Sequence, residues 1–244
     1  MTPEAIALMA GAVFVVAFLY SSVGHAGASG YIAVMALFGV ASAIIKPTAL
    51  LLNIAVASIG ALQFWRAGYF QWRLFWPFAL LSIPCAFLGG YANLPSHFFK
   101  MLVGLVLLFS AVRLVIKPPE ETEPHLPKLP VAIGTGASLG LLAGLTGTGG
   151  GIFLTPLMLF RHWALTKNVS AASAMFILAN SLAGLAGNFS SAKTLPRVAW
   201  PLLAAVMVGG TMGSYLGCRH FSATLIKRLL AVVLFVAGLK LILA

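Results

Sequence analysis

The sequence predicts an all-α membrane protein, a polytopic transmembrane helix bundle of two inverted repeats with glycine-broken or re-entrant helices. Hydrophobic residues make up 61% of the 244 residues and charged residues only 8%, whereas a soluble domain carries about 25% charged residues. Several apolar stretches approach the roughly 20 residues that a helix needs to cross a bilayer. Glycine-rich segments also interrupt the apolar sequence at matching places in the two halves.

The expected elements follow the same order in each half. A long apolar helix runs into a glycine-rich break, a shorter apolar segment follows, and three further spans complete the half. The clearest spans lie at residues 5–23, 48–65, 74–92, 101–116, 198–217 and 229–243. The shorter segments lie at 31–45 and 152–165. The sequence leaves open whether each of these crosses the membrane or dips into it and returns.

A polar stretch divides the chain. Residues 117–130 contain five prolines and three acidic residues, a composition that prevents a stable helix. We therefore expect a first transmembrane repeat at residues 1–116, a Pro/Glu-rich linker at 117–130 and a second transmembrane repeat at 131–244. Collinear matches between the halves support a duplication: they pair Gly24, Gly27 and Gly30 with Gly144, Gly147 and Gly150, Lys46 with Lys167, and Trp76-Pro77 with Trp200-Pro201.

Loop charges favour an inverted arrangement of the two repeats. If each half crosses the membrane an odd number of times, ten of the 15 Lys and Arg residues fall on one side and five on the other. An even number of crossings puts eight of these residues on one side and seven on the other, which indicates no orientation of the protein in the membrane. Because cytoplasmic loops carry the excess of Lys and Arg, the odd count places both termini outside. The net charge of +11 is thus explained by basic residues scattered between spans.

The two glycine-rich breaks, residues 24–30 and 144–151, form the expected solute site. Hydrocarbon cannot hydrogen-bond to free N–H and C=O groups, so irregular backbone survives in a membrane only where it lines a cavity or contacts protein or ligand. Broken helices at corresponding places in two halves indicate the binding site of a transporter. Close helix packing is the alternative role for glycine. It explains five glycines within residues 144–151 poorly, since each lowers helix stability.

The placement of acidic residues favours an anion as the solute. The chain has no Asp, and its four acidic residues, Glu4, Glu120, Glu121 and Glu123, lie outside the spans. Carboxylates are the usual intramembrane cation ligands and proton relays, whereas helix N-termini, hydroxyls and amides can hold an anion without formal charge. The expected partners are a small anionic substrate and the lipid bilayer. No nucleic acid, cofactor or metal is expected, and a homodimer is left open.

The candidate substrate-binding residues combine the glycines with neutral polar side chains. They are Gly24, His25, Gly27, Ser29, Gly30, Asn53, Thr146, Gly147, Thr148, Gly149, Gly150, Gly151 and Asn180. His25 is either a hydrogen-bonded structural residue or, when protonated, a group that helps to hold the anion. Asn53 and Asn180 either hydrogen-bond between helices or donate to an oxygen of the solute. Lys46 and Lys167 are expected to snorkel to the interface or, if the short segments are re-entrant, to attract anions.

The second break resembles a family signature. The run GLTGTGGGIFLTP at residues 144–156 and the run KNVSAAS at 167–173 resemble the pattern of the sulfite exporter TauE/SafE family. The resemblance extends over nearly the whole chain and implies a multispan inner-membrane carrier of small sulfur-containing anions, sulfite and organosulfonates among them. The first copy departs from the fuller pattern, because residues 24–30 read GHAGASG and Ala36 stands where the second copy has Pro156.

The expected function is a secondary transporter that moves a small anion across the inner membrane through a central site between the repeats. The resemblance implies sulfite or an organosulfonate as that anion. A passive anion channel of the same architecture is the alternative. An enzyme is not expected, since the sequence has no HExxH motif, no paired intramembrane Asp and no Ser–His pairing at helical spacing. The sequence also lacks an ATP-binding GxxxxGK[ST] motif, so the solute gradient or accompanying protons would drive transport.

Overall fold

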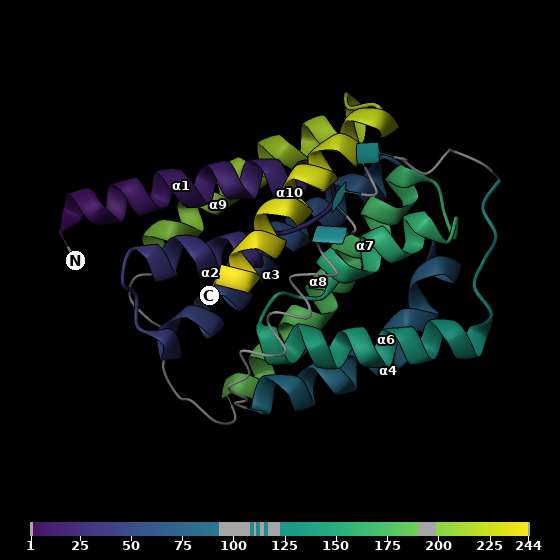
Figure 1. Ribbon diagram of the computed structural model, residues 1–244, viewed down its shortest axis with the longest axis horizontal. Helices are drawn as coiled ribbons and strands as arrows, with labels where there is room; N and C mark the ends of the chain where they lie inside the picture. Colours follow the sequence, from purple (N-terminus) through teal and green to yellow (C-terminus); the bar gives the residue numbers. More distant parts are fainter. Residues whose placement is uncertain are drawn as a thin grey trace.

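The protein is a bundle of helices (Figure 1). The computed structural model describes residues 2–92, 108–109, 111–112, 115–116, 123–189 and 199–243, and all regular secondary structure in these ranges is helical. The helices are α1 (Pro3–Ser22), α2 (Ala28–Leu37), α3 (Ser42–Arg66), α4 (Trp72–Tyr91), α6 (Leu129–Thr146), α7 (Gly151–Phe160), α8 (Thr166–Phe189), α9 (Ala199–Arg219) and α10 (Ala223–Leu243). This confirms the all-α class.

Most of the predicted spans correspond to described helices. Six helices, namely α1, α3, α4, α6, α8 and α9, are long and apolar enough to cross a membrane, and α10 covers the span predicted at 229–243. The protein is therefore a multi-pass membrane protein. The span predicted at 101–116 and the first part of the predicted linker lie largely outside the described residues. Residues 123–128 of the linker are non-helical.

The two short apolar segments form half-length helices. α2 and α7 have 10 residues each, which corresponds to about 15 Å, half of the roughly 30 Å hydrocarbon core. In Figure 1 the chain reverses at each break, so that α2 runs back beside α1 and α7 runs back from the end of α6. Neither helix can cross the bilayer alone, which favours the re-entrant alternative. α2 ends at Leu37, earlier than the predicted segment at 31–45, and residues 42–45 of that segment belong to α3.

Glycines bring the helices into close contact at two interfaces. On α6, a Cβ added to Gly136, Gly140 or Gly144 would collide with the α4 backbone at Phe78, Ser82 or Ala86. On α9, a Cβ at Gly209, Gly213 or Gly217 would collide with the α1 backbone at Phe14, Phe18 or Ser22. Small residues every four positions let membrane helices approach closely. These six glycines therefore pack helices together, and they include Gly144, which lies within α6 although it was predicted to belong to the second break.

The helices of the two halves exchange partners. α1 packs on α9 and α4 packs on α6, at opposite edges of the bundle, while α3 and α8 pack on each other between them (Figure 1). If the halves are repeats, α1 corresponds to α6 and α4 to α9, so the two outer pairs are equivalent. The duplication itself stays a prediction.

Candidate functional site

Both glycine-rich segments interrupt the helices. α1 and α2 are separated by residues 23–27, and α6 and α7 by residues 147–150. The chain turns through left-handed glycines, which tolerate positive φ because they lack a Cβ. These are Gly24 (82°), Gly27 (103°), Gly147 (73°), Gly149 (74°) and Gly150 (80°). Two glycine-broken helices, as predicted, are therefore present.

Each break leaves a helix N-terminus uncapped inside the protein. Gly27 precedes α2 and Gly150 precedes α7, and neither helix has a side-chain cap. The carbonyl of Gly27 accepts from the N–H of Tyr31, and the carbonyl of Gly150 accepts from the N–H of Phe153. The N–H groups at the start of each helix, before Tyr31 and Phe153, have no acceptor within their own helix. Both breaks are buried. Because a helix N-terminus carries the positive end of the dipole, each break presents buried partial positive charge.

His25 connects the first break to the second half of the chain. Its Nε2 lies 3.1 Å from Thr155 Oγ1 on α7, and that hydroxyl lies 2.7 Å from Ser173 Oγ on α8. The ring also lies against the backbone of Gly151, where α7 begins. Only 4% of His25 is exposed. His25 therefore has the hydrogen-bonded position of a structural residue, and this position also brings it to the start of the second half-helix.

Asn53 lies at the second break. Its Nδ2 donates to Ser181 Oγ at 3.3 Å, which joins α3 to α8. A Cβ added to Gly149 would lie 3.0 Å from Asn53 Nδ2 and 2.8 Å from Ser181 Oγ. Asn53 is fully buried, and its Oδ1 has no hydrogen-bond partner. The three residues thus form a compact polar cluster where the backbone of the second break is irregular.

Asn180 faces another helix. Its Oδ1 accepts a hydrogen bond of 2.6 Å from Ser82 Oγ on α4, and its Nδ2 has no partner. The link between α4 and α8 is the interhelical role that was weighed for both asparagines. The hydrogen bond of Asn180 goes to α4, whereas Asn53 lies beside Gly149 of the second break, so Asn53 is the better placed of the two.

The remaining candidate residues fall into hydroxyl pairs and packed glycines. Ser29 Oγ lies 3.0 Å from Tyr20 Oη, and Thr146 Oγ1 lies 2.8 Å from Thr148 Oγ1. Thr146 also donates to the carbonyl of Leu142, so part of its capacity is used within α6. The glycines lie against other elements: Gly24 against Ser170, Gly27 against Tyr31, Gly30 against Val16, Gly147 against Lys46, Gly150 against Phe176 and Gly151 against Ile177.

Sequence reasoning missed the polar face of α8. Ser170, Ser173 and Ser181 are all fully buried and face the breaks, as Ser170 packs on Gly24, Ser173 bonds Thr155 and Ser181 bonds Asn53. Their spacing of 3 and 8 residues places them on one face of a helix. That periodicity was the available signal. α8 therefore contacts both breaks and forms the common wall of the candidate site.

Lys46 and Lys167 hold the ends of two helices. Lys46 Nζ donates to the carbonyls of Gly89, Gly90 and Ala92 at 3.3–3.4 Å, at the C-terminus of α4. Lys167 Nζ donates to the carbonyl of Cys218 at 3.1 Å, at the C-terminus of α9. A cation there is favourable because C-terminal carbonyls carry the negative end of the helix dipole. Both lysines thus bind backbone carbonyls of the protein.

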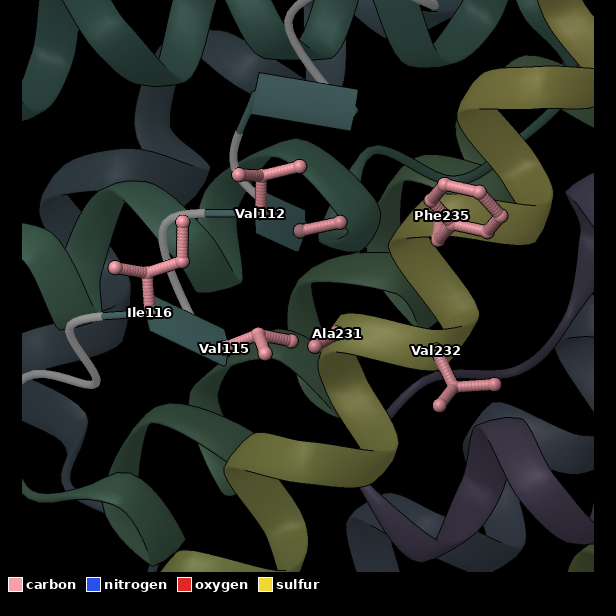
Figure 2. Close-up of a pocket in the computed structure, with 7 residues that line it drawn as sticks. Val112, Val115, Ile116, Ala231, Val232 and Phe235 are labelled. Carbon is pink, nitrogen blue, oxygen red and sulfur yellow. The ribbon is translucent and has the colours of Figure 1, made fainter.

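Two pockets lie apart from the breaks. In one, of about 300 Å³, the lining residues that the structure describes are all apolar, with Val112, Val115 and Ile116 facing α10 residues Ala231, Val232 and Phe235 (Figure 2). The other, of about 460 Å³, lies between α4, α8 and the linker and has polar residues in its wall. Among the described residues, no group of three His, Cys, Asp or Glu side chains is placed to hold a metal ion.

The fold and the buried breaks define a multi-pass membrane protein with paired half-helices. The chain matches the sequence model of the family described as sulfite exporter TauE/SafE over residues 9–241. It is also 43% identical to the "Probable membrane transporter protein y4hK" of Sinorhizobium fredii (strain NBRC 101917 / NGR234) over 247 residues, which cover 99% of this chain and 100% of that protein. No solved structure matches. The chain belongs to the sulfite exporter TauE/SafE family, as its motifs suggested.

Proposed function

We propose that this protein is a secondary transporter that moves a small anion, sulfite or an organosulfonate, through a central site between two inverted repeats. The observation that carries the proposal is the pair of buried, uncapped helix N-termini at Gly27 and Gly150. Backbone N–H groups at helix N-termini bind anions without a counter-ion. Glu4 lies in the first turn of α1, and the other three acidic residues of the chain belong to the predicted linker, so no carboxylate belongs to either break, where it would repel the anion.

The unpaired amide of Asn53 supports a ligand at the second break. A buried polar atom without a partner costs about 1–3 kcal/mol, and Asn53 Oδ1 is such an atom. The oxygen and nitrogen of a side-chain amide can exchange places by a 180° flip. In the flipped orientation the amide oxygen of Asn53 lies beside Ser181 and Gly149 and accepts from the Ser181 hydroxyl, and the NH2 group takes the place of the unpartnered oxygen. A bound oxyanion would then satisfy that donor.

The arrangement of the halves supports a carrier mechanism. Broken helices at corresponding places in two repeats are typical of carriers in which one repeat moves against the other around a fixed site. Both breaks are buried, so the solute cannot pass without a movement of the helices. A passive channel would instead need a continuous open path past the breaks.

Flux measurements in proteoliposomes test the proposal. We expect saturable uptake of [35S]sulfite, accelerated by unlabelled sulfite on the other side of the membrane, and loss of this uptake in Asn53→Ala. Ser58→Ala is the matched control, because the Ser58 hydroxyl is bonded within its own helix, to the carbonyl of Ile54. A large, non-saturating, voltage-driven current would identify a channel. Uptake of cations, with none of sulfite or sulfonates, would exclude an anion carrier.

A further inference from the structure

We propose a second ligand site, distinct from the glycine breaks, that binds an organic anion with an apolar body, such as an aromatic sulfonate or carboxylate. The site is the pocket of about 460 Å³ between the linker, the α3–α4 connection and the start of α8. Its volume lies within the roughly 300–1,000 Å³ of small-molecule sites. It does not depend on the transport function proposed above.

The wall of the pocket combines one cation with amides and apolar surface. Among the described lining residues Arg73 alone is charged, Gln71 and Asn168 contribute amides, and Trp163 and Leu126 contribute apolar surface. Small-molecule sites commonly have such a largely apolar wall with a few polar groups that orient the ligand. A sulfonate or carboxylate group at Arg73 would leave the body of the ligand against Trp163.

The position of Arg73 makes an anion the favourable occupant. Arg73 lies in the first turn of α4, a turn that contains no acidic residue and whose N-cap, Gln71, forms no side-chain cap. A cation at a helix N-terminus is unfavourable, because it lies beside the positive end of the helix dipole. An anion bound there would offset both the guanidinium charge and the dipole.

The pocket is held in shape by contacts on each side. The N–H of His125 in the linker donates to the carbonyl of His162 in the α7–α8 connection at 3.1 Å, which fixes the linker beside Leu126. Asn168 Nδ2 donates to the carbonyl of Tyr69 at 2.7 Å. The rings of Trp163 and Phe78 pack together, with their centroids 5.6 Å apart. Because these walls are preformed, binding requires little ordering of the protein.

The experiment measures thermal unfolding of the purified full-length protein with sodium benzenesulfonate, at constant ionic strength. Benzenesulfonamide is the neutral control ligand. We expect saturable stabilisation by benzenesulfonate alone. The apparent affinity should be at least tenfold weaker in Arg73→Gln and unchanged in Arg66→Gln, which replaces an arginine at the end of α3 that does not line the pocket. Leu126→Trp, a change in the non-helical linker that fills the pocket, should abolish it.

Three results would overturn the proposal. Equal stabilisation by benzenesulfonamide would show that no anion site exists. If Arg66→Gln lowered the affinity for benzenesulfonate as much as Arg73→Gln does, the effect would come from the overall charge of the protein. Normal binding by Leu126→Trp, with loss of binding in Asn53→Ala, would place the ligand at the glycine breaks instead. The last result would leave the proposed transport function standing, so the two proposals fail separately.

Discussion

His25 and Thr155 are hydrogen-bonded across the boundary between the two halves, with 3.1 Å between Nε2 and Oγ1, although they are 130 positions apart. The Thr155 hydroxyl is also hydrogen-bonded to Ser173 Oγ on α8. The first break is thereby attached to both the second half-helix and α8. A movement of one half against the other would have to break these two hydrogen bonds or move the three side chains together.

Replacing Thr155 by Val should destabilise the protein, since it removes both bonds and leaves two buried partners unsatisfied. Interhelical hydrogen bonds in membranes contribute about 0.6–1.7 kcal/mol each, so we expect a loss of about 1–3 kcal/mol, measured by unfolding in detergent. Thr211→Val is the control, because the exposed Thr211 hydroxyl bonds only within its own helix, to Met207. Equal effects of the two changes would show that the link is unimportant.

Gly149→Ala should impair both folding and solute binding. The left-handed conformation alone costs a side chain about 1–2 kcal/mol, and the new methyl group would also press on Ile177, Asn53 and Ser181 at 2.7–3.0 Å. Gly39→Ala isolates the first effect, because Gly39 has a similar φ of 71° and nothing within 4 Å of the added atom. Solute-induced stabilisation should vanish only in Gly149→Ala. Its loss in both variants would point to general damage.

Two glycines of α6 should respond to alanine with opposite signs. A methyl group at Gly140 would collide with the backbone of Ser82, whereas one at Gly134 meets nothing within 4 Å. We expect Gly140→Ala to lower the free energy of unfolding by about 1–3 kcal/mol through overpacking. Gly134→Ala should raise it by up to about 1 kcal/mol, because alanine favours a helix. Similar effects at both positions would contradict the close contact between α4 and α6.

Lys46→Met should lower the free energy of unfolding and leave the affinity of the protein for anions unchanged. The ammonium group contacts three carbonyls at the end of α4, and such a cation contributes about 0.3–2 kcal/mol. Unfolding and the KM of uptake, measured together, separate the two roles. Lys128→Met, at an exposed position, should change neither. A raised KM without loss of stability would restore the expectation that Lys46 attracts solute.

Periodicity and composition predicted the architecture because each depends on local sequence. Left-handed glycines such as Gly27 and Gly150 determine where a helix stops, and the length of the following apolar run determines a half-helix. The hydrogen-bond partners depend instead on how distant helices meet. Nothing near Asn53 in the sequence distinguishes it from Asn180, yet one contacts a break and the other contacts Ser82. The polar spacing on α8 was visible, but its significance required knowing that both breaks face it.

The central claim is that neutral groups at the two breaks bind a small anion inside the membrane domain. The most direct measurement is the thermal stabilisation of the purified protein by sulfite and organosulfonates, compared between the wild type and Asn53→Ala. A ligand at a hundred times its Kd should stabilise the folded wild type by roughly 2.7 kcal/mol, and Asn53→Ala should lose most of this gain. Stabilisation by cations alone, or an equal response of the variant to sulfite, would contradict the claim.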